Sequence, residues 1–275
     1  MPIAKLERTV LRLSGDKVKE WLSGLITNSI VDEVTFAALL TPQGKIIADF
    51  FITQSHDDLL IDTPPKFGEI LKKRLSMYKL RAPVTLSDVS EDMHVYGIWG
   101  TDEEEDGHQD PRHASLGRRL ITSQVLEGIG DNIGDDHMAA YNAHRLSLGV
   151  PDSHWDFESG QLFPLDASMD LLRGLDYQKG CFIGQEVVSR MHRMSQVKKR
   201  LRAIILPSPS DHERPPIKAG DDILCGERVV GHIHHRHHNM AIGLVRLDRL
   251  ATCETTPTIN AAHIEIMKAV DGSDK

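Results

Sequence analysis

The ten residues 177–186 constrain the fold and function of this chain more than any other stretch. They read YQKGCFIGQE and place Cys181 between two glycines, Gly180 and Gly184. Glycine permits backbone conformations, and close approaches of other backbone, that a side chain would forbid. The polar pair Gln185-Glu186 suits the first turn of a helix, where the helix dipole is positive. The stretch therefore predicts a tight turn that presents a cysteine just before a helix.

Two interpretations of Cys181 are open. Lys179 precedes it by two residues and the predicted helix follows it, and both a cation and a helix N-terminus favour a thiolate. Alternatively, Cys181 is a small buried residue that packs beside Phe182 and Ile183, since free cysteine is among the most buried residue types. The glycines and the lysine favour a functional thiol, with Lys179 assisting it.

The motif resembles the K-G-C-[YF]-x-G-Q-E signature of the YgfZ family. The matching residues are Lys179, Gly180, Cys181, Phe182, Gly184, Gln185 and Glu186. That family comprises folate-binding proteins of iron–sulfur cluster assembly or repair, related to the glycine cleavage T-protein, an aminomethyltransferase. Weaker resemblances lie at residues 27–29 (TNS, where the family has T-N-D), 78–84 (YKLRAPV), 145–151 (RLSLGVP) and 163–166 (FPLD).

Composition narrows the class of protein. The chain has 275 residues, 40% of them hydrophobic, and a formal net charge of −8, which argues against a dedicated nucleic-acid binder. The acidic run 102–106 is expected to be a solvated loop, and the basic run 190–202 a solvated face or a patch for an anionic partner. No apolar run reaches the ~20 residues of a membrane span. We expect a cytoplasmic protein without a targeting segment, whose three cysteines form no disulfide framework.

Hydrophobic periodicity predicts an α+β protein with antiparallel sheets. Strands are expected at 4–13, 36–40, 45–53, 59–62, from 84, at 93–99, 118–122, 199–206, 223–230 and 242–247, and helices at 18–25, 67–78 and 135–148. The resemblance implies a three-lobed ring in which two interwoven α/β lobes and a C-terminal β-barrel enclose a channel. We expect the first lobe at 1–90, the second, with the motif, at 91–195, and the barrel at 196–275.

The resemblance also implies tetrahydrofolate as a ligand of the channel. Asp49 lies in a predicted apolar strand, at a position similar to a T-protein segment in which a carboxylate sits beside folate. The T-protein has two acids there, whereas this chain has Ala48-Asp49. A folate site also needs a cation for the glutamate tail. Arg145 is our candidate for it, although a surface ion pair is the more common fate of such an arginine.

Three functions follow from these residues. The favoured one is a tetrahydrofolate-binding accessory protein for assembly or repair of iron–sulfur enzymes, with Cys181 as its working thiol and those enzymes or assembly proteins as partners. The second is a folate-dependent aminomethyltransferase that uses Asp49. The third is a folate sensor without chemistry at Cys181.

Five histidines crowd the window 232–238. Imidazole is a common metal ligand, but no cysteine or clear carboxylate completes a ligand set within the window. We therefore expect no native metal site, and adventitious binding of nickel or zinc during purification.

Overall fold

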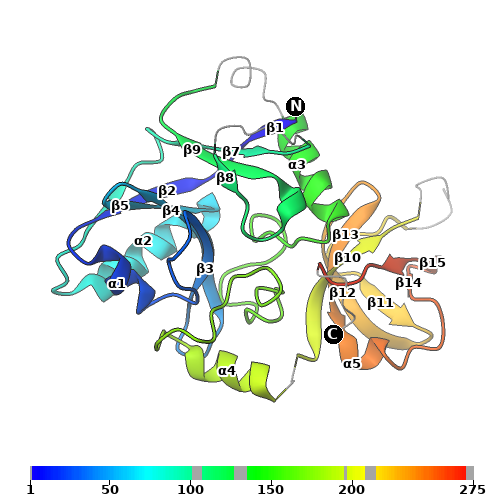
Figure 1. Cartoon of the computed structure of the whole chain (residues 1–275). Coiled ribbons are helices and arrows are strands. Elements are labelled where there is room, and N and C mark those ends of the chain that lie inside the picture. Colours follow the sequence, from blue (N-terminus) through cyan, green and yellow to red (C-terminus); the bar gives the residue numbers. More distant parts are fainter. Residues whose placement is uncertain (1, 101–106, 127–134, 195–196, 208–214, 271–275) are drawn as a thin grey trace.

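The structure is a computed structural model that describes residues 2–100, 107–126, 135–194, 197–207 and 215–270. The predicted acidic loop, residues 102–106, lies outside the described residues. Three lobes surround the segment 149–184, which contains no long helix or strand (Figure 1). The predicted fold class, α+β with antiparallel sheets and a C-terminal barrel, is confirmed.

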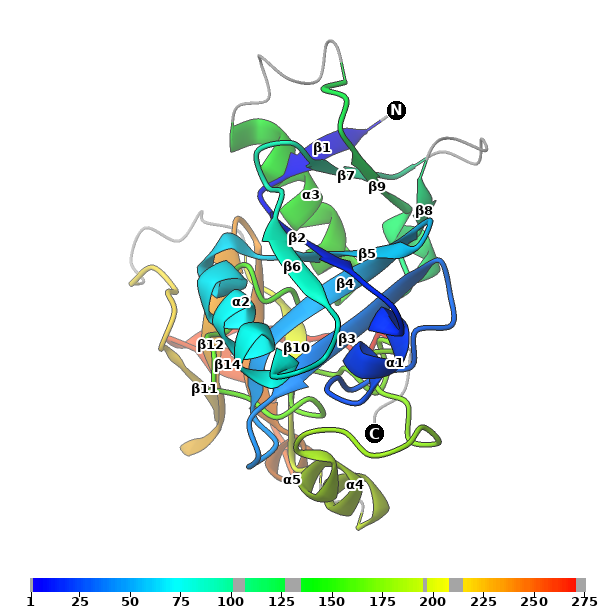
Figure 2. The same ribbon diagram turned by 90° about the vertical axis from the view of Figure 1, so that its left-hand side faces the viewer.

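A five-stranded antiparallel sheet forms the first lobe. Its order is β3 (Val34–Leu40), β4 (Ile46–Ser55), β5 (Asp58–Thr63), β2 (Thr9–Ser14) and β6 (Thr85–Asp88). One face packs on the apolar sides of α1 (Val18–Ser23) and α2 (Pro65–Lys79), and Figure 2 shows α2 lying across the strands. Because side chains alternate along a strand, β4 turns Ala48 and Phe50 to these helices and Asp49 and Phe51 to the opposite, inner face.

The second lobe is built on a four-stranded antiparallel sheet. Its order is β1 (Ile3–Leu6), β7 (His94–Ile98), β9 (Arg118–Thr122) and β8 (His108–Gln109), with α3 (Asp135–Ser147) packed against β1. The single strand predicted at 4–13 was wrong: the chain leaves one sheet after Leu6 and enters the other at Thr9. This switch makes the two lobes interwoven, as expected.

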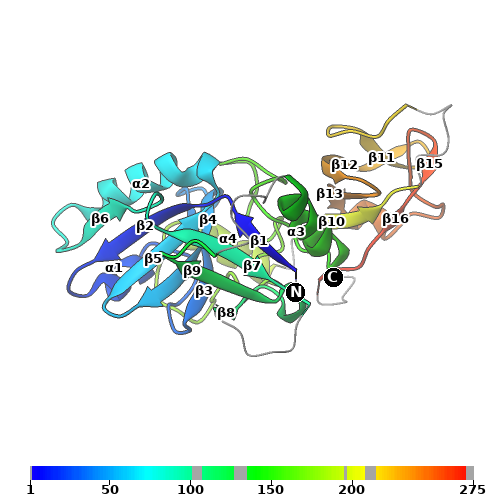
Figure 3. The same cartoon turned by 90° about the horizontal axis from the view of Figure 1, so that it is seen from above.

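Seven strands form the third lobe, which lies to one side of the other two (Figure 3). In sheet order they are β15 (Ala262–His263), β14 (Thr258–Ile259), β11 (Asp222–Cys225), β12 (Arg228–His237), β13 (Met240–Arg246), β10 (Lys199–Ile205) and β16 (Glu265–Ile266). The first and last strands of this order are separated in sequence only by Ile264, so the sheet curves into a nearly closed barrel. The single strand predicted at 223–230 is instead a hairpin that turns between Cys225 and Arg228.

A disulfide joins Cys225 to Cys253 in the barrel, with their Cα atoms 5.9 Å apart. The expectation that the cysteines form no disulfide was therefore wrong. The curvature of the barrel brings together residues 28 positions apart in the sequence, which spacing alone does not reveal. Cys181 is the one free cysteine of the three.

Candidate functional site

Cys181 is exposed on a turn that leads into α4 (Gln185–Arg193). The next residue, Phe182, is buried in the central apolar cluster together with Phe36 and Phe51. The alternative interpretation, in which Cys181 is buried beside Phe182 and Ile183, was therefore wrong, because Phe182 is buried but Cys181 is not. Phe182 anchors the turn, and the thiol next to it stays accessible.

Hydrogen bonds to residues 27–29 fix the chain that leads to the thiol. Thr27 Oγ1 donates to the carbonyl of Gly174 at 2.8 Å, and the Asp176 amide donates to the carbonyl of Thr27 at 3.0 Å. Ser29 Oγ donates to the Asp176 carboxylate at 2.6 Å. The TNS segment is therefore a clamp on the motif, and Ser29 keeps a polar contact at the position where the family has an aspartate.

Lys179 belongs to the same clamp. Its Nζ donates to the carbonyl oxygens of Ser23, Ile26 and Asn28 at 2.6, 2.7 and 3.0 Å, which uses all three of its donors. Burial lowers the pKa of Lys179 to about 8, although Asp176 opposes the shift. The prediction that this ammonium pairs with the thiol of Cys181 was therefore wrong. The ammonium uses its hydrogen bonds to hold the end of α1 and the loop after it.

The two glycines of the motif differ in their steric requirement. Gly184 has a φ of +81°, and a Cβ there would meet the Thr41 carbonyl oxygen at 2.7 Å. Gly184 thus lets the start of α4 lie against the hairpin turn between β3 and β4. A Cβ on Gly180 would meet nothing within 4 Å, and the φ of Gly180 is not left-handed, so the predicted steric need for glycine holds only at Gly184.

We expect Gly184→Ala to lower the free energy of unfolding by about 1–3 kcal/mol, because the left-handed backbone is strained by a Cβ and the Thr41 carbonyl must move. Gly180→Ala should change it by less than about 0.5 kcal/mol. Urea denaturation of both variants measures the difference. Equal destabilisation by the two substitutions would contradict this account of the turn.

Helix α4 carries polar and basic side chains beside the thiol. Gln185 and Glu186 occupy its first turn as predicted, and Glu186 pairs with Arg190 one turn later at 2.9 Å. Arg193 lies in the last turn, where cations suit the helix dipole. Only the first part of the predicted basic run is therefore an exposed, mostly positive helical face next to Cys181. The expectation was wrong for its end, because Arg200 and Arg202 are buried on β10, where Arg200 binds Asp170 at 2.6 and 2.7 Å.

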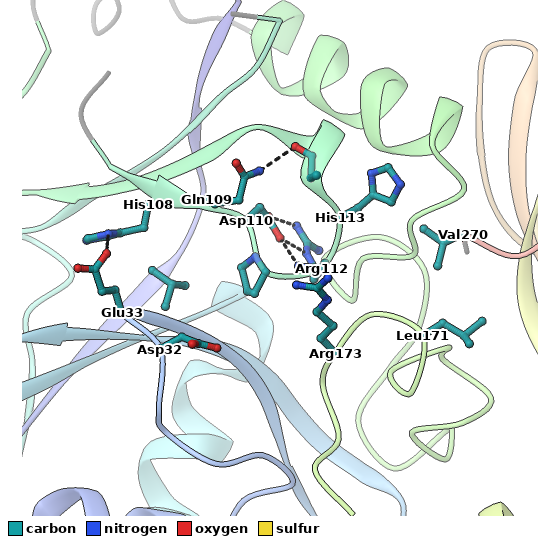
Figure 4. A pocket seen from close by; sticks show the side chains of 13 residues that line it. Asp32, Glu33, His108, Gln109, Asp110, Arg112, His113, Leu171, Arg173 and Val270 are labelled. Atoms are coloured by element: carbon teal, nitrogen blue, oxygen red, sulfur yellow. Dashed lines mark hydrogen bonds and ion pairs between the residues drawn. The ribbon is translucent and has the colours of Figure 1, made fainter. Parts of the chain in front are cut away.

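A cleft of about 650 Å³ opens between the first two lobes (Figure 4). Its lining comes from the start of β3, from β8 and the loop after it, and from two later segments. Apolar side chains include Val34, Leu171 and Val270. Arg173 extends into this space, and among the described residues its exposed guanidinium has no hydrogen-bond or ion-pair partner.

Arg112 forms the inner end of the cleft and is almost fully buried. It makes two hydrogen bonds to the carboxylate of Asp110, at 2.9 and 3.1 Å, and one each to Asp152 and to the Tyr141 hydroxyl, both at 2.9 Å. Such a bidentate, buried pair fixes the geometry of the loop that follows β8.

The ring of Phe51 lies beside three guanidinium groups. The centres of Arg119, Arg112 and Arg8 are 3.6, 4.7 and 5.7 Å from its centroid. Arg8 and Arg119 both bind Asp62, at 2.6 and 2.7 Å. The interior between the first two lobes is thus a network of paired charges around an aromatic ring.

Asp49 belongs to this interior. It is 7% exposed and accepts a hydrogen bond from the Ser153 hydroxyl. Burial raises its pKa to about 6 and nearby Asp152 adds to the rise, whereas the Ser153 hydrogen bond and Arg8 and Arg112 oppose it. Asp49 is not among the residues that line the cleft, so its predicted contact with folate stays a prediction.

The pKa of Asp49 makes stability depend on pH in a defined direction. The folded state binds this proton more tightly than the unfolded chain, in which the pKa is near 3.8, so stability falls as pH rises from about 4 to above 6. The full effect is about 3 kcal/mol. We expect Asp49→Asn to remove this component. Urea denaturation at pH 5 and pH 7.5 tests it: an unchanged difference between the two pH values in the variant would contradict the assignment.

Arg145, the predicted cation for a folate tail, is fully buried. Its guanidinium holds both oxygens of Asp156, at 2.6 and 3.1 Å, and also bonds Asn142 and the carbonyl of Val150. Trp155 covers it at 4.7 Å. Arg145 therefore binds the carboxylate of Asp156 within this chain, in place of the folate carboxylate predicted for it. The structure brings neither Arg145 nor Asp49 into contact with Cys181.

Sequence reasoning missed the residues that line the cleft. Arg112 and Asp110 follow the acidic run in a stretch without hydrophobic periodicity, and Arg173 precedes the motif. Only the position of Arg173-Gly174, between the two segments 163–166 and 177–186 that resemble the family, could have indicated a functional role for Arg173.

Comparison with known proteins identifies the group that this chain resembles. Residues 198–269 match the family model described as CAF17, C-terminal beta-barrel domain. Over 219 residues the chain is 30% identical to the "Iron-sulfur cluster assembly factor IBA57 homolog, mitochondrial" of Mycosarcoma maydis. The chain is similar to iron–sulfur cluster assembly factors. The human IBA57 protein is 28% identical over 227 residues.

These alignments cover 70% of the chain in both cases, but only 54% and 63% of the two relatives. The chain therefore spans between half and two thirds of their length. Among solved structures, the glycine cleavage system aminomethyltransferase T from Bartonella henselae superposes with a TM-score of 0.73, covering 99% of this chain and 86% of that one. At 12% sequence identity this likeness establishes the fold alone. Within the described residues, no helix is both long and apolar enough to cross a membrane.

Proposed function

We propose that this chain is an accessory protein for assembly or repair of iron–sulfur enzymes, of the YgfZ type, in which Cys181 is the working thiol and the cleft holds reduced folate. The observation that carries the proposal is the accessibility of Cys181 on a turn fixed from both sides. The names of the relatives, iron–sulfur cluster assembly factors, support the same role.

Cysteine thiolates are the usual ligands of iron–sulfur clusters, and a [2Fe–2S] or [4Fe–4S] cluster typically requires four of them. This chain offers one, because Cys225 and Cys253 are bonded to each other. It cannot supply four cysteine ligands alone. A cluster that passes over Cys181 therefore needs further ligands from a client enzyme or assembly protein, and the turn beside α4 is where that partner would bind.

The size of the cleft and part of its lining support reduced folate as the ligand in this proposal. Its volume of about 650 Å³ falls within the ~300–1,000 Å³ typical of small-molecule sites. Val34 and Leu171 offer apolar surface to a pterin, and Arg173 offers a cation to the glutamate tail. In this proposal Arg173 takes the role first predicted for Arg145. Asp49 acts on the ligand through Arg112, whose positive charge lies near the Asp49 carboxyl group.

We expect the full chain to bind tetrahydrofolate and Arg173→Ala to weaken binding at least ~10-fold, because one charge-assisted contact to a carboxylate is lost. Isothermal titration calorimetry with tetrahydrofolate measures both. Arg190→Ala, which removes an exposed arginine outside the cleft, is the matched control. Absence of heat and of any thermal shift at millimolar ligand would contradict the folate site, and equal affinity of Arg173→Ala would contradict its placement.

The rival function, aminomethyl transfer to folate, has less support than the fold likeness suggests. Asp49 is the one acid at this position on the inner face of β4, while Ala48 packs in the apolar core under α1 and α2. The residue that stands in place of the second acid thus belongs to the core, so we do not propose transferase activity.

A further inference from the structure

We propose that His232 and His234, on β12 of the barrel, form a two-histidine binding site for a divalent transition-metal ion of the Zn²⁺ class. Their Nε2 atoms are 3.2 Å apart, and the two rings stack with centroids separated by 5.1 Å. Both histidines line a groove of about 300 Å³ together with Glu158, which is paired with Lys66, and Gln161. This site differs from the expectation that the histidine window holds no native metal.

The tautomer of His234 is fixed by the backbone. Its Nδ1 lies 2.7 Å from the carbonyl oxygen of Asp156, and a carbonyl can only accept a hydrogen bond. Nδ1 therefore carries the proton and Nε2 presents its lone pair. A backbone carbonyl that orients the far nitrogen in this way is the usual support of a metal-binding histidine. Arg145 holds the carboxylate of Asp156 and so keeps this carbonyl in place.

The spacing of the two Nε2 atoms suits a shared ion. Two imidazole nitrogens bound to Zn²⁺ at ~2.0–2.1 Å in tetrahedral geometry are ~3.3 Å apart. The observed 3.2 Å is close to this separation. In the metal-free chain the two nitrogens face each other in a hydrogen bond, so both rings must turn before their lone pairs meet at one ion. Without metal, the same contact requires the Nε2 of His232 to donate a hydrogen bond to the Nε2 of His234. When a metal ion binds, the proton of His232 therefore moves from Nε2 to Nδ1.

The other histidines of the window are excluded by their contacts. The Nε2 of His235 contacts the side-chain amide of Asn142 at 3.1 Å, and its ring faces Trp155. The rings of His237 and His238 meet edge to face, and within the described residues no ring nitrogen of one lies within hydrogen-bond distance of a ring nitrogen of the other. Within the described residues, no three His, Cys, Asp or Glu side chains are grouped to hold an ion. The site therefore offers two protein ligands and open positions for water or a partner's side chain.

The test is a Zn²⁺ titration of the tag-free full chain, followed by calorimetry in competition with a chelator of known affinity. We expect one ion per chain, and His232→Ala should weaken its binding at least ~10-fold, since removal even of a supporting contact commonly costs that much. His232 is exposed, so this variant should keep the wild-type thermal unfolding midpoint. His263→Ala, an exposed histidine on β15 of the same barrel, is the matched control and should bind as the wild type does.

Three outcomes would overturn the site: no Zn²⁺ binding by the wild-type chain, unchanged affinity in His232→Ala, or an equal loss in His263→Ala. A second variant, His234→Gln, checks the result independently. It removes the imidazole while keeping a side chain that can donate to the Asp156 carbonyl, and it should lose Zn²⁺ to the same extent as His232→Ala.

Discussion

Replacing Cys181 by serine is expected to reduce the activity of cluster-dependent client enzymes to the level of a strain that lacks this protein, while the fold stays intact. The side chain is exposed and serine is close to it in size, whereas serine is a poor ligand for iron–sulfur clusters. The measurement is the activity of a radical-SAM iron–sulfur enzyme in a deletion strain that expresses either the variant or the wild-type chain at matched levels.

The matched control removes the other two cysteines. The double variant Cys225→Ser/Cys253→Ser breaks the barrel disulfide and leaves the exposed thiol, so it should retain client activity if the barrel still folds. Iodoacetamide should label Cys181 in the native wild-type chain and leave Cys225 and Cys253 unlabelled until reduction. Full client activity with Cys181→Ser would favour a folate sensor without chemistry at this residue.

Arg145→Met should destabilise the chain by about 3–5 kcal/mol, the usual cost of leaving one member of a buried ion pair without its partner. Both Arg145 and Asp156 are fully buried, and methionine fills a similar volume without a charge. Arg190→Met is the control, since the Arg190–Glu186 pair is exposed on α4 and should contribute about 0.5 kcal/mol or less. Urea denaturation measures both variants.

A different result would return Arg145 to the folate site. If Arg145→Met unfolds at the wild-type urea concentration and loses tetrahydrofolate binding, the guanidinium acts on the ligand, and Asp156 is not its essential partner. If the variant instead unfolds at a lower urea concentration than the wild type, the ion pair between Arg145 and Asp156 is structural. The second result also predicts a weaker Zn²⁺ site, because Asp156 orients His234.

Local features of the sequence were sufficient to predict the motif turn and most elements. The start of α4 follows from Gly184 and the polar pair after it, and α3 from its apolar periodicity and the glycine after it. These predictions succeed because caps and periodicity act over a few residues. The barrel, by contrast, was implied mainly by resemblance.

Features that depend on distant contacts were not predictable in this way. The sequence pairs Lys179 with the thiol two residues away, but its three acceptors lie about 150 positions earlier in the chain. Arg145 is a candidate ligand contact by resemblance, yet its partners come from its own helix and from the chain just after it. The disulfide and the switch of sheets after Leu6 likewise arise from tertiary pairing.

Deletion of this protein is the most direct test of whether it serves iron–sulfur enzymes. We expect a deletion strain, with cellular folate held constant by supplementation, to lose most of the activity of a radical-SAM iron–sulfur enzyme. A cluster-free dehydrogenase in the same extracts should be unaffected, and the wild-type chain should restore the loss. Unchanged activity of the iron–sulfur enzyme in the deletion strain, at equal enzyme abundance, would contradict the account.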